Sequence, residues 1–389
     1  MIRLSARDVM ARARSALSDH GVVLFAFVAS RLALLAVGLL TLIHIRPLTT
    51  AGNAVSLSGQ QALNIWGAWD TGWYMDLALN GYQRAPGLDG QANWAFFPAF
   101  PGLAVTIAHL TGLTIFQAML VVSNLAFLTA LILIHRLARD EFDDRTAGLA
   151  VVLLCVAPGS HVFSAAYTEA LFLAGVAGSL VLMRNRLWLA AGAMAALAAL
   201  TRNLGIGLLL PYAWSALERL RSAPRPSAPE LARMVLGGLF PIAAILGFML
   251  YLKARTGDPL AFMHVQKAWH RGLSDPFTPL LNGVIHPSTV HDADLLSLAA
   301  GWLAIGLLIV LAAMRRWRLL SLALFLTLAP LAAGVASFAR YALVDLPLSL
   351  VAAKLLADRP RAATAVIASL AMLNGFIMVA WTLGLWVAA

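Results

Sequence analysis

The stretch GVVLFAFVASRLALLAVGLLTLI, residues 21–43, holds one charged side chain, Arg31, in an otherwise apolar run. As an α-helix it is long enough to cross the ~30 Å hydrocarbon core of a bilayer. The stretch therefore predicts a membrane-spanning helix. A charge inside such a span is costly and needs a partner, so we expect Arg31 either to serve a function or to form a structural ion pair.

Composition extends this prediction to the whole chain. Of its 389 residues, 61% are hydrophobic and 12% are charged, whereas soluble domains carry about 25% charged residues. Too little polar surface remains to cover a soluble globule, and the roughly ten-residue alternation of barrel strands is not visible. We expect an all-α polytopic membrane protein that forms one domain over 1–389, with about eleven spans at 21–43, 115–136, 146–163, 168–183, 187–201, 204–217, 234–252, 295–313, 319–337, 342–356 and 363–387.

The formal net charge of +10 is explained by basic cytoplasmic loops, which orient membrane proteins, and does not require nucleic acid as a partner. With a cytoplasmic N-terminus, most of the 28 Lys and Arg residues lie on the cytoplasmic side. The C-terminus is then outside, and two long outer loops cover about 44–114 and 253–294. Because Pro98 and Pro101 interrupt the apolar segment 94–113, we expect that segment to lie along or dip into the outer face.

The sequence predicts no metal and no cofactor. Cys155 is the single Cys and lies in an apolar run, so the chain has no disulfide framework and no thiol metal site. His264 and His270 are six residues apart, which does not match the i, i+4 spacing of a metal pair on one helix face. The chain also lacks a glycine-rich phosphate loop and a nucleophile elbow.

Two carboxylates stand among aromatic residues in WDTGWYMDLALNGYQ, residues 69–83. If 66–80 is helical, Asp70 and Asp76 lie roughly 120° apart, so we do not expect them to act as a pair. Asp70 is either the N-cap of a helix beginning at Thr71 or a general base at the boundary of water and lipid, and the two roles are compatible. The aromatic residues around it are candidate substrate contacts: Trp69, Trp73 and Tyr74.

A second group of polar residues is expected at the same outer level. Glu169 in SAAYTEALF is favoured there by the dipole of the helix it begins, or it serves a function as an acid at the membrane boundary. Arg202 in ALTRNLG and Arg340 in SFARYAL either bind a lipid phosphate or anchor the chain at the interface. Two neighbouring tyrosines join the candidate substrate contacts: Tyr167 and Tyr341.

The second long outer loop contains TGDPLAFMHVQKAWHRGLSDPF, residues 256–277. Polar and aromatic side chains gather in it, a composition suited to contact with a sugar or a phosphate. We expect three of its residues to bind substrate: His264, Gln266 and Trp269.

Six motifs in the same order resemble the bacterial relatives of the PIG-V family: WDTGWYMDLALNGYQ, WAFFPAFPGL, SAAYTEALF, ALTRNLGI, GDPLAFMHVQKAW and ARYALVDLPL. The resemblance covers about 30–350. It implies the GT-C glycosyltransferase fold, which is a multi-span helical bundle with juxtamembrane helices in the first outer loop. It also implies transfer of a hexose, mannose by the family's name, from a polyprenyl-phosphate donor to a lipid or glycan hydroxyl with inversion.

The resemblance also implies roles for individual residues. The acid of the first outer loop is generally the base in GT-C enzymes, a role that carries onto Asp70. Glu169 takes an auxiliary or acceptor-orienting role, and Arg202 and Arg340 become candidates for the donor phosphate. Metal is not required by many enzymes that use monophosphate donors. The site would face the periplasm from the bacterial inner membrane.

Two other classes compete with an enzyme. A secondary transporter would account for the spans and for Arg31, although transporters often contain repeated halves and no repeat is visible in this sequence. A non-catalytic lipid-binding membrane protein is the third possibility, and it would tolerate replacement of Asp70 by Asn.

Overall fold

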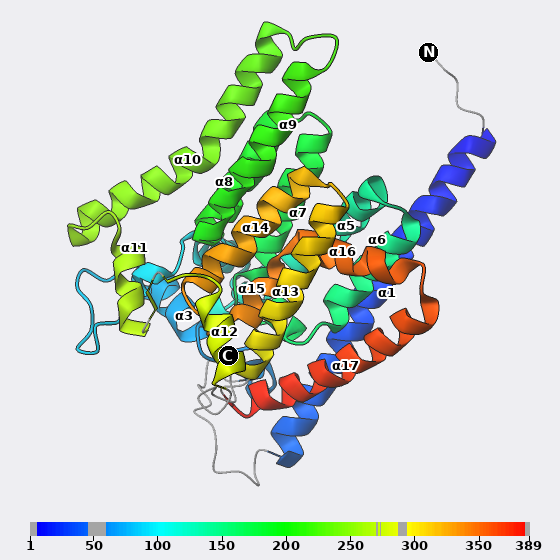
Figure 1. Cartoon of the computed structure of the whole chain (residues 1–389). Coiled ribbons are helices and arrows are strands. Elements are labelled where there is room, and N and C mark those ends of the chain that lie inside the picture. The colour runs from blue at the N-terminus through cyan, green and yellow to red at the C-terminus, as the bar shows by residue number, and fades with distance from the viewer. Residues whose placement is uncertain (1–5, 46–59, 270, 273, 287–293, 386–389) are drawn as a thin grey trace.

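The computed structural model describes residues 6–45, 60–269, 271–272, 274–286 and 294–385. Every regular element in these ranges is a helix (Figure 1). The predicted all-α class is therefore confirmed.

Five helices among the described residues are long and apolar enough to cross a membrane. They are α1 (Ala6–Leu40) with its π-helical end η1 (Thr41–Ile45), α5 (Ile115–Glu141), α10 (Ala228–Thr256), α13 (Leu295–Ala313) and α17 (Pro360–Thr382). The other expected spans coincide with shorter helices, so the total of eleven stays a prediction. These helices are α6 (Asp144–Val156), α7 (Glu169–Arg184), α8 (Trp188–Thr201), α9 (Leu209–Arg221), α14 (Trp317–Ala332) and α16 (Leu346–Ala357).

Some expected spans are broken where the sequence contains a helix breaker. The apolar run 146–163 is not one helix, because α6 ends before Pro158 and Gly159 has a left-handed φ of 87°. A 3₁₀ turn, η4 (Ser160–Phe163), follows. Likewise 204–217 begins in the 3₁₀ helix η5 (Asn203–Leu208), and 342–356 is divided between α15 (Phe338–Val344) and α16.

The two long loops that we expect on the outer side contain short helices. The first holds α2 (Gln61–Asn64), α3 (Thr71–Asn80), the 3₁₀ turn η3 (Asn93–Ala95) and α4 (Ala99–Thr111). The second holds α11 (Ala261–His264), the 3₁₀ turn η6 (Val265–Trp269) and α12 (Thr278–Ile285). Helix α3 begins at Thr71, which is the start that the N-cap alternative for Asp70 predicted, and not at residue 66. Helix α4 packs on α3 and α5. The position of 94–113 relative to the membrane stays a prediction.

Helix α7 is the centre of the bundle. Fourteen of its residues are buried, and it packs on α5, α8, α9 and α15 (Figure 1). Small residues let its neighbours approach closely: a Cβ added at Gly175 would lie 3.2 Å from the carbonyl oxygen of Met194 on α8. The N-terminal end of this buried helix carries Glu169.

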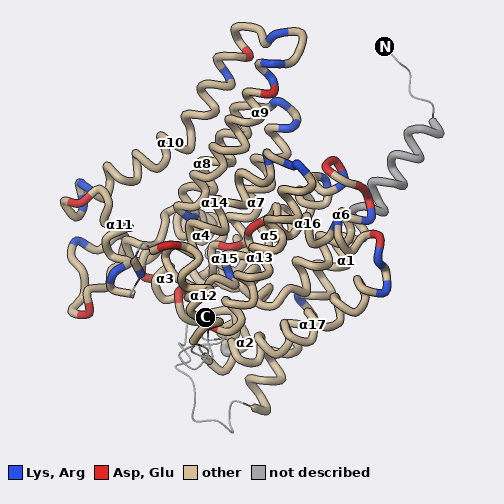
Figure 2. Tube along the Cα trace, viewed as in Figure 1, with Lys and Arg blue, Asp and Glu red and all other residues tan. Residues whose placement is uncertain are grey.

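Charged residues gather at the turns between helices (Figure 2). At the end of α5, the buried Glu141 pairs with Arg318 on α14 and with Arg184 on α7, whose Nη1 lies 3.0 Å from Glu141 Oε1. Arg316 donates to the Glu141 carbonyl oxygen at 3.0 Å. One carboxylate thus joins three helices at the side expected to face the cytoplasm.

Candidate active site

Asp70 lies at the end of a short non-helical link between α2 and α3. Tyr167 Oη donates a hydrogen bond to the Ala68 carbonyl oxygen (3.2 Å) and accepts one from the Asp70 amide (3.1 Å). Asp70 occupies the N-cap position of α3, but its side chain makes no capping hydrogen bond. Its carboxylate is turned to Arg340 instead, so the capping role predicted for that side chain is wrong.

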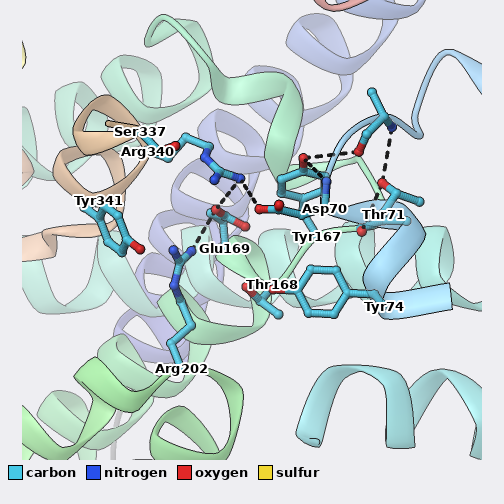
Figure 3. Close-up of polar contacts among 12 residues, drawn as sticks. Asp70, Thr71, Tyr74, Tyr167, Thr168, Glu169, Arg202, Ser337, Arg340 and Tyr341 are labelled. Carbon is cyan, nitrogen blue, oxygen red and sulfur yellow. Dashed lines mark hydrogen bonds and ion pairs between the residues drawn. The ribbon is translucent and has the colours of Figure 1, made fainter. Parts of the chain in front are cut away.

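Four charged side chains from distant parts of the chain form one network (Figure 3). Arg340 on α15 places Nη1 3.0 Å from Asp70 Oδ2 and 3.8 Å from Glu169 Oε1. Arg202, the C-cap of α8, places Nη1 2.7 Å from the same Glu169 oxygen. We refer to Asp70, Glu169, Arg202 and Arg340 as the charge network.

Exposure separates the two carboxylates of the charge network. The Asp70 side chain is 34% exposed, whereas that of Glu169 is 1% exposed. Asp70 is therefore the carboxylate that a bound molecule can reach. Glu169 is held between two guanidinium groups, which suits a residue that fixes the positions of its neighbours.

Both arginines of the network remain charged. Burial alone would lower the pKa of Arg202, but Glu169, Tyr341 and Tyr74 together outweigh that effect and raise it. The pKa of Arg340 is well above its ordinary value, because Asp70, Tyr167 and Glu169 together outweigh burial. A carboxylate within ion-pair distance thus offsets the cost of removing each arginine from water.

Tyr341 marks a positive potential beside the network. Burial raises the pKa of a tyrosine, yet that of Tyr341 is lowered because Arg271, Arg202 and Arg340 outweigh burial. Arg202 also lies 4.8 Å from the centre of the Tyr341 ring. Arg271 reaches the Tyr341 hydroxyl at 3.4 Å and Ser337 Oγ at 3.5 Å, both long hydrogen bonds.

The predicted aromatic contacts assemble around Asp70 in part. Tyr74 Oη lies 3.2 Å from Thr168 Oγ1, next to Glu169 in sequence. Trp73 on α3 and Trp269 on η6 meet edge to face with ring centres 5.7 Å apart, which brings the two outer loops together. Trp69 precedes Asp70 in a left-handed conformation, with φ of 48°.

Other predicted residues lie apart from the charge network. His264 is 61% exposed, and its Nδ1 lies 2.6 Å from Asp258. Gln266 shares η6 with Trp269, and its carbonyl oxygen accepts from the Arg271 amide. Asp76 is hydrogen-bonded to three amide side chains of the first loop, as expected for a carboxylate that does not act with Asp70: Asn80, Gln83 and Asn93.

Arg31 has partners, but none of those among the described residues is a carboxylate. Its Nη1 donates to the Ser160 carbonyl oxygen at 2.7 Å, and its Nη2 donates to Ser160 Oγ at 2.9 Å and to the Cys155 carbonyl oxygen at 3.3 Å. Arginine is thus used to satisfy backbone carbonyls at the broken end of α6. Of the two alternatives for Arg31, the ion pair is therefore not formed with a described residue, and the guanidinium caps backbone carbonyl groups.

Sequence reasoning missed four residues near Asp70. Thr168 and Ser337 are small and polar, a type that gives no signal on its own. Arg271 stood in the predicted polar loop without being singled out. Trp381 lies in the apolar run of α17 and was counted only as part of a span.

The fold and the site define a multi-span helical membrane protein with a carboxylate–arginine centre. Residues 21–222, more than half of the chain, match the mannosyltransferase (PIG-V) family, and the chain belongs to that family. The resemblance inferred from the six motifs is therefore confirmed.

The family match and the likeness to one solved structure place the fold in the GT-C class. A crystal structure of ArnT from Cupriavidus metallidurans bound to undecaprenyl phosphate is 18% identical, with a TM-score of 0.52, over 93% of this chain and 68% of that one. The oligosaccharyltransferase of Archaeoglobus fulgidus, tethered to an acceptor peptide, is 13% identical with a TM-score of 0.47, over 93% of this chain and 55% of that one. No curated protein sequence matched the chain.

Proposed function

We propose that the protein transfers a hexose, mannose by its family, from a polyprenyl-phosphate donor to a hydroxyl of a lipid or glycan, with inversion, at the periplasmic face of a bacterial inner membrane. The observation that carries this proposal is the Asp70 carboxylate. It is open to a bound molecule and held 3.0 Å from a buried guanidinium. The ArnT structure contains undecaprenyl phosphate, a carrier of the proposed class.

Asp70 acts as the general base. It accepts the proton of the acceptor hydroxyl while that oxygen forms a bond to the anomeric carbon of the sugar. The bond between this carbon and the donor phosphate oxygen breaks, and the electron pair leaves with the polyprenyl phosphate. Attack from the face opposite the phosphate inverts the configuration at the carbon.

The charges of the site match this reaction. Three guanidinium groups, those of Arg202, Arg340 and Arg271, accompany two carboxylates, so one positive charge is left over for a ligand. A donor phosphodiester carries one negative charge and balances it. On transfer, the phosphate gains a second negative charge as a monoester while Asp70 becomes neutral by protonation. Charge therefore moves from Asp70 to the phosphate inside a site that stays neutral.

Arg340 can stabilise the negative charge first on Asp70 and then on the leaving phosphate. Its guanidinium contacts Asp70, and its neighbour Tyr341 contacts Arg271. Electrostatic stabilisation of the charge that develops on a leaving group is usually the largest single contribution to such a step. Glu169, which is buried between Arg202 and Arg340, keeps both arginines in place and so takes the auxiliary role.

The experiment uses purified protein in nanodiscs, radiolabelled polyprenyl-phosphate mannose and a total lipid extract of the host. Wild type is compared with Asp70→Asn and with Asp89→Asn, a control in an exposed part of the same outer loop. We expect label in a new product with wild type and the control, and a rate about 10²- to 10⁴-fold lower with Asp70→Asn.

Other outcomes separate the alternatives. Transfer from a different polyprenyl-phosphate sugar would keep the class and change the sugar. Equal transfer by wild type and Asp70→Asn would move the base to Glu169. Absence of transfer from every such donor would reject the enzyme and leave the transporter and the lipid-binding protein as the remaining classes.

A further inference from the structure

The link that presents Asp70 is backbone without helix, between the end of α2 at Asn64 and the start of α3 at Thr71. It includes Trp69 in a left-handed conformation, with φ of 48°. A non-glycine residue keeps such a conformation only where its surroundings hold it. The position of Asp70 therefore depends on the groups that bind this link.

Three side-chain and backbone donors bind the link from outside. Trp381 Nε1 donates to the Ile65 carbonyl oxygen at 2.8 Å, and the Ala166 amide donates to the Trp66 carbonyl oxygen at 3.0 Å. Tyr167 Oη donates to the Ala68 carbonyl oxygen and accepts from the Asp70 amide. Two of the donors precede α7, and the third comes from the last turn of α17.

Trp381 supports the link twice. Its indole N–H holds the start of the link directly, and its ring packs edge to face on Tyr167, with ring centres 5.4 Å apart. The Trp381 ring also packs on the fully buried His161, with ring centres 4.5 Å apart. Trp381 itself is 2% exposed, so both contacts are made in the packed interior.

We infer that Trp381 is a positioning residue for Asp70, and that α17 forms the back wall of the active site as well as a membrane span. This inference rests on the proposed function for its effect on catalysis, but not for its effect on the link. Helix α17 lies outside residues 21–222, so the family match alone does not point to it. Figure 2 shows the C-terminal end of α17 beside α2.

The test compares wild type with Trp381→Phe, which keeps a ring and loses the N–H, and with Trp381→Leu, which loses both. Trp302→Phe on α13, 41% exposed, is the matched control. The first measurement is hydrogen–deuterium exchange of the full chain in nanodiscs. We expect exchange in 65–71 to be about fivefold faster in Trp381→Phe and faster still in Trp381→Leu, with α7 and the control unchanged.

The second measurement is steady-state transfer. Because a small misplacement of a reacting group lowers the rate of the chemical step, we expect kcat to fall about tenfold in Trp381→Phe while the donor KM stays within about twofold. A purely structural role would not separate kcat from KM in this way.

The two measurements distinguish a failure of the positioning role of Trp381 from a failure of the proposed activity. Faster exchange confined to 65–71 in a protein that transfers no sugar would retain the positioning role and reject the enzyme. Unchanged exchange in both variants, or exchange raised throughout the chain, would overturn the inference. So would a variant with normal kcat.

Discussion

Arg271 differs from the other two arginines at the site in its partners. The guanidinium groups of Arg202 and Arg340 each meet a carboxylate, whereas the hydrogen bonds of the Arg271 guanidinium among the described residues are with hydroxyls at 3.4 and 3.5 Å. We predict that Arg271→Gln lowers kcat/KM for the donor about 10- to 100-fold, since a hydrogen bond to a charged group contributes about 1.5–3 kcal/mol. Arg271→Lys should recover part of the loss, because lysine keeps the positive charge but cannot donate two parallel hydrogen bonds to a phosphate as arginine can.

Binding of undecaprenyl phosphate, measured by tryptophan fluorescence in nanodiscs, checks this prediction without catalysis. Undecaprenol, which lacks the phosphate, should bind wild type and Arg271→Gln equally. Arg84→Gln removes an exposed arginine from the first outer loop and is the control for net charge. If Arg84→Gln weakens binding as much as Arg271→Gln does, the effect is general attraction and Arg271 has no specific role.

The four residues of the charge network could be predicted from the sequence because acids and arginines next to apolar runs are rare and costly there. Their pairing could not. The same pattern fits a phosphate-binding arginine and an arginine that neutralises an acid, and only distances such as 2.7 Å between Arg202 and Glu169 distinguish them. Trp381 gave no signal, because a tryptophan in an apolar helix is equally typical of lipid contact.

At the scale of elements, α6 is fixed at its start by one side chain. Asp143 Oδ1 accepts from the Thr146 amide at 2.8 Å as the N-cap, and Oδ2 accepts from Lys354 Nζ on α16 at 2.8 Å. The hydrogen bond from Lys354 and then that from Thr146 lower the pKa of Asp143 to about 2. The ionised form is thus the one that stabilises the fold.

We predict that Asp143→Ala lowers the free energy of unfolding by about 1 kcal/mol at pH 7, the usual cost of a lost N-cap. The Asp143 side chain is 39% exposed, so the ion pair adds little to this. Because the folded pKa is depressed, the contribution is present above the unfolded value of about 4 and is lost as pH falls towards 2.

Thermal unfolding in detergent between pH 7 and pH 2 measures this difference. Asp144→Ala is the control, since Asp144 is adjacent and its side chain is 81% exposed. A difference between wild type and Asp143→Ala that stays constant down to pH 2 would show that the ionised carboxylate is not responsible.

Helix positions followed from apolar runs, but helix ends did not. The run 146–163 is apolar throughout, and hydropathy alone gives no reason to stop at Val156. Pro158 and Gly159 end the helix, and the carbonyl groups released there bind Arg31. The helix breakers Pro158 and Gly159 in one expected span and the charged Arg31 in another are thus related, because Arg31 binds the carbonyl groups that the breakers leave free.

At the scale of the molecule, the site requires the whole chain to fold. Its parts come from the first outer loop, the start of α7, the end of α8, the second outer loop, α15 and α17. No spacing in the sequence predicts that Asp70 and Arg340 meet. The order of the six motifs indicated the family, and the family implied one site, but the contacts depend on how the helices pack.

The same packing makes the orientation of the chain testable. An odd number of spans with a cytoplasmic N-terminus puts the first outer loop and the C-terminus on one side and the loop between α9 and α10 on the other. We predict that Leu88→Cys and Leu385→Cys react with an impermeant maleimide in intact cells, whereas Ala228→Cys reacts only after permeabilisation. All three positions are exposed, and the native Cys155 is buried, so the wild type serves as an unlabelled background. Labelling of Leu88→Cys without Leu385→Cys would require an even number of spans. In that case the last turn of α17, which carries Trp381, could not lie beside the link that presents Asp70, because the two would be on opposite faces of the membrane.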